Sequence, residues 1–486
     1  MNSNSQKNVL LISADHWSAH LLGCAGHSVL MTPTLDQLAR DGVRFTNCYS
    51  TCPVCIPARR SLMTGMSPAS HGDRVYSDRM PMPDAITLAQ AFRNAGYQTV
   101  AVGKLHVYPQ RSRIGFDEVI LQEEGRYEFG IVDDYQLWLG EHGYIGEEFG
   151  HCMGSNSYYT RPWHLPENAH PTTWATREMI RQIQRKDPTR PALFYMSYQF
   201  PHPPLVPLQC YLDLYADSEI DLPQVDDDWM DDSTIQQLLR EQAMPYTEKD
   251  IRRARRAFYA QCTHIDHQIR SLIGTLRECN LLKDTIIVFL SDHGDTLFDH
   301  GMVGKRTFYE GSANIPLIFS GEPMAQWRGT KTDRLACLED IMPTLLDLCG
   351  IEIPSTVEGI PLFSNQTRSM LYGEIGEGPK ATRMVTDGQL KLIYYPCGNV
   401  FQLFDTQADP QERCNLYGLP GYEERTQCLY HYLVEHLHGS DLAWLKDGVL
   451  KGVPAPDFKP SPDYALFNQR GLHWPPPSGY SNTGKT

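Results

Sequence analysis

The chain has 486 residues, of which 41% are hydrophobic and 21% charged, and its formal net charge is −15 at pH 7. This composition is typical of a globular protein, and the length exceeds what one hydrophobic core usually fills, so we expect one large and one small domain. The negative charge argues against nucleic acid and anionic membranes as partners, because both require a basic protein surface.

The beginning of the chain carries no pattern typical of secretion. Residues 1–7 are polar and lead directly into the apolar run at residues 9–12, without a basic region or a long hydrophobic stretch. No apolar run reaches the length that a membrane span requires. The 13 cysteines are odd in number and scattered, which favours a reducing compartment over a disulfide framework. We therefore expect a cytoplasmic protein.

Apolar runs and amphipathic stretches alternate along the first two thirds of the chain. Runs typical of buried strands lie at residues 9–14, 98–102, 192–198, 285–290 and 315–319. Helical spacing covers residues 33–40, 85–94, 172–185, 249–276 and 338–348. This alternation predicts an α/β sandwich around a large, mostly parallel central sheet. Ligands of such sheets gather at the carboxyl ends of the strands.

The last quarter of the chain has a different sequence pattern. Short alternating segments at residues 383–386, 391–395 and 401–404 predict a small antiparallel sheet, followed by a helix at residues 423–436. From residue 454 the chain is rich in Pro and Gly. We divide it into a large domain at 1–365, an α+β subdomain at 366–453 and a tail at 454–486. The tail either covers the protein's own surface or packs on a second copy in a homo-oligomer.

Two predicted strands end in residues that suit a divalent metal. Asp15 ends the first strand, and Asp292 and His293 follow the run at residues 285–290. If both strands belong to one sheet, these carboxylates and the imidazole meet at its carboxyl edge as metal ligands. Taken alone, an aspartate after a strand is more often a helix or turn cap.

The segment at residues 52–65 carries the most specific pattern in the chain. Cys55 precedes Pro57, which suits a first helical turn, so the thiol would face the positive end of a helix dipole. Arg59 lies one turn further along the same face. A single cysteine is usually a buried, inert thiol, but this spacing indicates a nucleophile.

Around Cys55 the chain resembles the sulfatase family of the alkaline phosphatase superfamily. Cys55, Pro57 and Arg59, followed by Ser-Leu-x-Thr-Gly at residues 61–65, are similar to the family's signature for oxidation of cysteine to formylglycine by a dedicated maturation enzyme. Other motifs resemble the family in order along nearly the whole chain, at Asp15 and at residues 103–106, 201–204, 291–295, 304–305, 315–317, 403–405 and 409–412. The resemblance implies an alkaline phosphatase-like sandwich that hydrolyses a sulfate monoester to alcohol and inorganic sulfate.

The resemblance implies a metal site made of Asp15, Asp292, His293 and the modified residue 55. Oxygen ligands favour Ca²⁺, which we expect, or Mg²⁺, and the imidazole leaves room for Mn²⁺. His16 departs from the family, in which Asp, Asn or Gln usually stands at this position. Either the imidazole of His16 replaces that ligand or the site has one carboxylate fewer.

The resemblance also implies roles for five basic residues around the sulfate oxygens, where negative charge persists through the transition state: Arg59, Lys104, His106, His202 and Lys305. One hydroxyl of hydrated formylglycine would attack sulfur, with His202 and Lys305 serving the leaving oxygen. His106 would then take the proton of the second hydroxyl, which expels sulfate and restores the aldehyde. Considered singly, Lys104 and Lys305 are more typical of surface or loop lysines, and the two histidines are more typical of a turn or of the core.

Two loop-like regions, at residues 122–171 and 206–247, are expected to wall the pocket. The first carries Tyr127, Tyr135, Trp138, Tyr158, Tyr159 and Trp163. The second contains an acidic run at residues 226–232. An acidic or aromatic side chain at the pocket mouth would favour a cationic or aromatic alcohol over polyanionic chains. His71 and Asp78 follow the Cys55 segment in sequence, and we assign them no role.

Three functions are compatible with these residues. The first is a sulfatase that acts on a small sulfate ester. The second is a phosphonate monoester or phosphodiester hydrolase, which by resemblance shares the fold and the formylglycine; Lys104 together with His106 favours sulfate instead. The third is a non-catalytic protein that binds sulfate esters and whose Cys55 is never matured.

Overall fold

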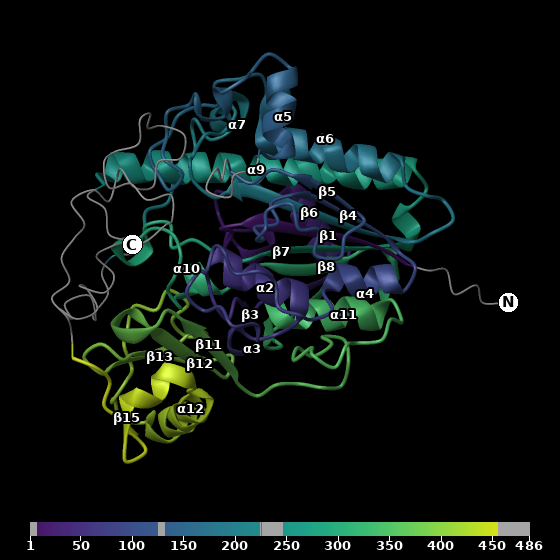
Figure 1. The fold of residues 1–486 in the computed structure, drawn as a ribbon. Helices are drawn as coiled ribbons and strands as arrows, with labels where there is room; N and C mark the ends of the chain where they lie inside the picture. The colour runs from purple at the N-terminus through teal and green to yellow at the C-terminus, as the bar shows by residue number, and fades with distance from the viewer. Residues whose placement is uncertain (1–6, 125–131, 224, 226–245, 455–486) are drawn as a thin grey trace.

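An eight-stranded sheet forms the centre of the structure, a computed structural model that describes residues 7–124, 132–223, 225 and 246–454 (Figure 1). Its strands lie in the order β5 (Glu118–Leu121), β4 (Gln98–Gly103), β6 (Ala192–Pro201), β1 (Asn8–Asp15), β7 (Thr285–Ser291), β8 (Leu317–Ser320), β2 (Val43–Phe45) and β9 (Thr330–Thr332). All neighbouring strands are parallel except β8, which runs antiparallel to both β7 and β2. The predicted mostly parallel sheet is confirmed.

Helices cover both faces of this sheet (Figure 1). One layer contains α1 (Pro33–Arg40), α5 (Asp134–Glu141), α6 (Pro171–Gln184), α7 (Gln209–Asp213) and the long α9 (Glu248–Glu278). The other contains α2 (Cys55–Thr64), α4 (Leu88–Asn94) and α11 (Ile341–Leu348). Side chains of β1 alternate between the layers, since Leu10 and Ile12 pack toward α9 whereas Val9 and Leu11 pack toward α2 and α11.

Most element boundaries agree with the sequence prediction, and the differences have local causes. The helix expected from residue 85 begins at Leu88, because the Thr87 side chain caps it by accepting a hydrogen bond from the Gln90 backbone N–H at 3.2 Å. The strand expected from residue 315 begins at Leu317, because Pro316 has no N–H for a strand ladder. The helix expected from residue 338 begins with a 3₁₀ turn, and α11 itself starts at Ile341.

A second, antiparallel sheet contains β11 (Leu371–Ile375), β12 (Thr382–Thr386), β13 (Leu390–Tyr395) and β14 (Val400–Asp405), with α12 (Glu423–His436) packed on it. Besides 3₁₀ helices, the described residues form several short elements: α3 (Pro68–His71), α10 (Glu310–Ala313), β3 (Cys48–Tyr49), β10 (Ala336–Cys337), β15 (Leu445–Lys446) and β16 (Val449–Leu450). Buried Lys391 connects β13 of this small sheet to α10. Its Nζ lies 2.7 Å from a carboxylate oxygen of Glu310 and 2.6 Å from one of Glu412. The small antiparallel sheet is confirmed, whereas the division at residues 365 and 453 stays a prediction.

Among the described residues, no helix combines the length and the hydropathy needed to cross a bilayer. Tyr127, the acidic run at residues 226–232 and the tail beyond Pro454 lie outside the described residues. The predictions about the acidic run and about a tail-mediated homo-oligomer therefore stay predictions, as does the cytoplasmic location.

Candidate active site

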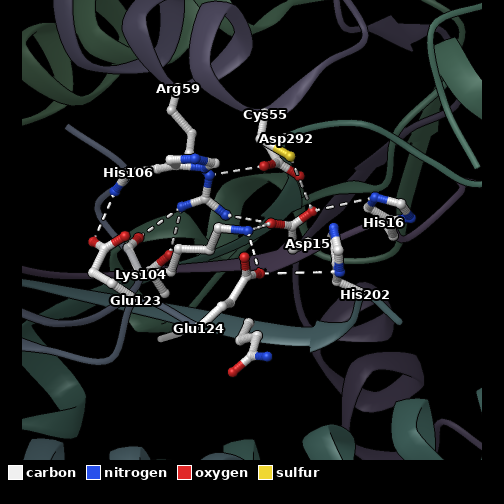
Figure 2. Close-up of polar contacts among 12 residues, drawn as sticks. Asp15, His16, Cys55, Arg59, Lys104, His106, Glu123, Glu124, His202 and Asp292 are labelled. Atoms are coloured by element: carbon white, nitrogen blue, oxygen red, sulfur yellow. Dashed lines mark hydrogen bonds and ion pairs between the residues drawn. The ribbon is translucent and has the colours of Figure 1, made fainter. Parts of the chain in front are cut away.

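Five parallel strands deliver polar residues to the same edge of the central sheet. The residues at or just after their carboxyl ends are Glu123 and Glu124 (β5), Lys104 and His106 (β4), His202 (β6), Asp15 and His16 (β1), and Asp292 and His293 (β7). Cys55 meets them from the first position of α2. The sheet edge thus gathers the residues that the sequence analysis selected (Figure 2).

The backbone leaves the strands at this edge in unusual conformations. Gly103 has φ 104°, and a Cβ there would lie 1.9 Å from the carbonyl oxygen of Ser197, so only glycine lets β4 approach β6 so closely. His16, His106 and Glu124 also have positive φ, of 71°, 60° and 58°. Left-handed backbone at non-glycine residues is costly and concentrates at functional sites.

The thiol of Cys55 lies at the centre of the cluster and is 1% exposed. Lys305 Nζ donates to Sγ at 2.9 Å, His293 Nε2 lies 3.2 Å from it, and Asp15 Oδ1 lies 3.8 Å away. Burial alone would raise the pKa of this thiol, but Lys305, Lys104 and His293 outweigh burial and hold the pKa well below its ordinary value. The surroundings therefore stabilise an anion on residue 55.

Arg59 ties the two carboxylates together. Its Nε donates to Asp292 Oδ2 at 2.8 Å and its Nη2 to Asp15 Oδ2 at 3.3 Å. Nη1 donates to the Lys104 carbonyl at 2.7 Å and to the Ser197 hydroxyl at 2.8 Å. Arg59 is 2% exposed and its guanidinium is turned toward these partners, so its contacts fix the sheet edge.

Two groups of side chains have the spacing of metal ligands, with donor atoms within 4.8 Å of one another: Asp15, Cys55, Asp292 and His293, and Asp15, His16, Cys55 and His202. Burial and the neighbouring Asp15 raise the pKa of Asp292, although Arg59 and His293 act in the opposite direction. Carboxylate oxygens and an imidazole suit a divalent metal. The donor set therefore fits the metal that the sequence analysis expects, and it also includes His202, which was assigned to the leaving oxygen.

Lys104 lies between two carboxylates (Figure 2). Its fully buried Nζ donates to Asp15 Oδ2 at 2.6 Å and to Glu124 Oε1 at 2.5 Å. Glu124 Oε1 also lies 4.0 Å from His202 Nδ1. Burial, Lys305 and His16 hold the pKa of His202 well below its ordinary value. His202 is therefore neutral, and its Nδ1 donates to the Pro203 carbonyl at 2.5 Å.

A buried carboxylate holds His16. Asp295 Oδ2 lies 2.9 Å from His16 Nδ1 and also accepts a hydrogen bond from the Tyr158 hydroxyl. The other ring nitrogen, Nε2, lies 2.6 Å from Lys305 Nζ and 3.8 Å from Asp15 Oδ1. Asp295 therefore directs Nε2 of His16 into the cluster, in the manner of a carboxylate behind a metal-binding histidine.

His106 is held on two sides. Glu123 Oε1 accepts the backbone N–H groups of Leu105 at 2.8 Å and of His106 at 2.9 Å. The side chain of His106 is held as well, because its Nε2 lies 3.2 Å from the hydroxyl of half-buried Tyr76. The Cζ atom of Arg306 lies over the Tyr76 ring, 5.5 Å from its centroid. Tyr76 and Arg306 thus border the cluster next to His106.

His71 has a structural role instead of joining the cluster. It is buried, with Nδ1 accepting the Asp73 N–H at 3.3 Å and Nε2 lying 3.3 Å from the Ser61 hydroxyl. Burial and Arg60 lower its pKa to about 3. Because the unfolded chain binds this proton near pH 6.5, the folded state loses stability as pH falls below that value.

We expect the free energy of unfolding to fall by about 2 kcal/mol between pH 7 and pH 5 through His71 alone. Urea unfolding at both pH values measures this, and His71→Gln, which keeps a neutral donor and acceptor, should lose about that part of the pH dependence. An unchanged pH dependence in the variant would refute the assignment.

Two protein-family models match this chain. The family model Sulfatase matches residues 7–351, and a second model, N-sulphoglucosamine sulphohydrolase, C-terminal, matches residues 298–438. The first match spans well over half of the chain and contains every residue of the cluster. The chain belongs to the sulfatase family.

Individual relatives cover nearly all of this sulfatase. The arylsulfatase of Clostridium perfringens is 35% identical over 93% of the chain and 99% of its own length. The choline-sulfatase of Rhizobium meliloti is 31% identical over 85% of the chain and 83% of its own length. A phosphonate monoester hydrolase from Silicibacter pomeroyi has the same fold, with TM-score 0.75, 23% identity and coverage of 91% of this chain and 97% of its own. The predicted family and fold class are confirmed, and this sulfatase is a sulfuric ester hydrolase.

Sequence analysis missed several residues that contact the cluster. Glu123 and Glu124 follow β5, whose run Glu-Val-Ile-Leu at the sheet edge is only partly buried and gives no clear strand signal. Asp295 lies inside a motif that was recognised, but its partner Tyr158 is 137 residues away. Two adjacent acidic residues shortly after a run that contains Val119 and Ile120 were the available sign of Glu123 and Glu124.

Proposed function

We propose that this sulfatase hydrolyses small sulfate monoesters, with aryl sulfates as the leading class, by means of a formylglycine made from Cys55 and a divalent metal ion. The observation that carries the proposal is the position of Cys55. Its side chain lies where α2 meets the ends of β1 and β7, within 3.2 Å of Lys305 Nζ and His293 Nε2. A nucleophile at this point faces both the metal-binding group and the basic residues.

The residues around Cys55 have different roles in this reaction. Lys104 and Lys305 supply positive charge to the sulfate oxygens. Because His202 is neutral, Lys305 is the better proton donor to the leaving oxygen, and His202 orients it. His106, held by Glu123 and Tyr76, would take the proton that leaves residue 55 when sulfate departs. Arg59 holds Asp15 and Asp292 in place.

Asp15, Asp292, His293 and residue 55 would hold the metal, with Nε2 of His16 as a further ligand. The oxygen-rich donors favour Ca²⁺, with Mg²⁺ or Mn²⁺ as alternatives. When bound, the ion would supply Lewis acidity to residue 55 and to the sulfate group. The maturation enzyme that oxidises Cys55 is the protein partner this mechanism requires.

Asp295→Asn should weaken metal binding by about 10- to 100-fold, because the carboxylate that orients His16 is lost. Calorimetric titration with Ca²⁺ measures the affinity, and the melting temperature reports any general loss of structure. Tyr158→Phe is the matched variant: it removes one hydrogen bond to Asp295 but leaves the carboxylate on His16, so its metal affinity should stay close to that of the wild type. Equal affinities in all three proteins would exclude His16 from the metal site.

The alcohol half of the substrate meets Tyr76, the aromatic side chain beside His106. An aryl group can stack on such a ring, and the arylsulfatase relative is consistent with this class. A cationic alcohol is the second candidate, supported by the choline-sulfatase relative. Competition between an aryl sulfate, choline sulfate and a sulfated sugar ranks them, and preference for the sugar would refute the assignment.

The decisive experiment is the mass of the peptide that contains residue 55, from protein of the native source or co-expressed with a maturation enzyme. We expect formylglycine or its hydrate together with sulfate release from a sulfate ester. An unmodified thiol in active native protein would refute the mechanism. Faster turnover of matched phosphonate monoesters or phosphodiesters would instead favour the alternative hydrolase.

A further inference from the structure

We propose that Glu124 restricts the oxyanion pocket to monoanionic groups, so that the enzyme accepts sulfate esters and discriminates against dianionic phosphate monoesters. This inference rests on the proposed function, because it assigns charge selectivity to the same pocket. The residue was not among those expected from the sequence. Its place in the structure, next to Lys104 and near His202, suggests a role in what the pocket can bind.

Glu124 is not required to neutralise Lys104. Asp15 already contacts Lys104 Nζ at 2.6 Å, and Glu124 adds a second carboxylate at 2.5 Å. Burying a further carboxylate is costly even beside a cation. Glu124 is 3% exposed, and its backbone adopts φ 58°, which is unfavourable for a residue with a side chain. A buried, strained and electrostatically redundant carboxylate indicates a function.

Of the two carboxylates on Lys104, only Asp15 belongs to the metal-binding groups. Asp15 serves both Lys104 and the metal-binding groups, because its Oδ2 accepts from Lys104 Nζ whereas its Oδ1 faces Cys55 and His293. Glu124 therefore stays a second carboxylate on Lys104. A sulfate oxygen that reaches Lys104 Nζ also comes close to the Glu124 carboxylate, because Oε1 lies 2.5 Å from Nζ.

Charge then decides which ligand is tolerated. The sulfate group of a monoester carries one negative charge, whereas a phosphate monoester carries up to two at neutral pH. A carboxylate within several ångströms in a buried site opposes each charge of the ligand, so it penalises the dianion about twice as much as the monoanion. The shape of the two tetrahedral groups is similar, so charge is the property that Glu124 can select.

The test uses two ligands that share a ring and differ in charge: benzenesulfonate, a monoanion, and phenylphosphonate, a dianion at pH 8.5. Binding of each is measured by calorimetry to the full chain with Cys55 unmodified, in one metal-containing buffer. Glu124→Gln should strengthen phenylphosphonate relative to benzenesulfonate by about tenfold. Glu124→Asp, which keeps the charge, should retain the wild-type ratio. An unchanged ratio in Glu124→Gln would overturn the proposal.

Two further measurements keep the proposal falsifiable. Glu178→Gln on α6 removes a carboxylate paired with Arg181 at 3.0 Å and should leave the ratio unchanged. On the wild type, phenylphosphonate binding should weaken as the ligand loses its second proton, while benzenesulfonate binding follows no such change; parallel pH profiles would overturn the proposal even if Glu124→Gln failed to fold. Because these readouts require no turnover, they remain informative if sulfate-ester hydrolysis itself is not observed.

Discussion

Replacement of Cys55 by alanine is expected to lower kcat/KM for an aryl sulfate by at least about 10⁴-fold, since it removes the nucleophile. The fold should survive, because Cys55 is small and the cluster's ion pairs run through Asp15, Arg59 and Lys104 instead. The measurement is release of inorganic sulfate by purified variant and wild type, with unfolding by urea as the check on stability.

Cys52→Ala is the matched control. Cys52 lies three residues before Cys55, is also buried, and its Sγ contacts the Arg74 carbonyl at 3.8 Å. Burial and nearby acidic residues raise the pKa of the Cys52 thiol, opposite to the shift at Cys55. Cys52→Ala should therefore keep activity within about twofold of the wild type. Hydrolysis retained by Cys55→Ala would place the nucleophile elsewhere.

The strands that carry the cluster could be predicted because parallel strands buried on both faces are continuous apolar runs. β1 and β7 are buried along their whole length, and the polar residues that follow them are therefore conspicuous in the sequence. Lys104 and His202 follow β4 and β6 in the same manner. A polar or charged residue that follows such an apolar run can be recognised in the sequence without knowledge of the fold.

Other parts of the site depend on contacts that only the folded chain defines. β5 is an outermost strand of the sheet and is only partly buried, so its four residues gave no reliable sign of a strand. Glu124, which follows β5, was missed for the same reason. Asp295, in a recognised motif, contacts His16 from 279 residues away. Which carboxylate faces which cation is decided by the strand order β4-β6-β1-β7, and local periodicity does not encode that order.

The second large effect is expected for Asp15→Asn, which removes charge while it preserves shape. Asp15 is fully buried and accepts hydrogen bonds from Lys104 Nζ at 2.6 Å and Arg59 Nη2 at 3.3 Å. Burial and Cys55 would raise its pKa, but Lys104 and Arg59 outweigh them and hold it well below its ordinary value. The carboxylate is therefore charged at neutral pH and shared by two cations.

Loss of this charge should act on metal, turnover and stability together. Asp15→Asn is expected to lower kcat/KM by at least about 10³-fold and to leave less bound metal after dialysis. Stability should fall by about 3 kcal/mol, because two buried cations lose a counter-ion. Elemental analysis, sulfate release and urea unfolding measure the three effects.

Asp36→Asn in α1 provides the comparison that separates the site from a general loss of a carboxylate. Asp36 is half-buried and accepts the Cys24 N–H at 2.7 Å and the Thr32 hydroxyl at 3.0 Å, with no metal-binding group nearby among the described residues. Its replacement should cost about 1 kcal/mol of stability and leave metal content and turnover unchanged. If Asp15→Asn kept its metal and its activity while losing stability alone, Asp15 would be a structural counter-ion of Lys104 and Arg59, and the metal would have to be held by the other group members without it.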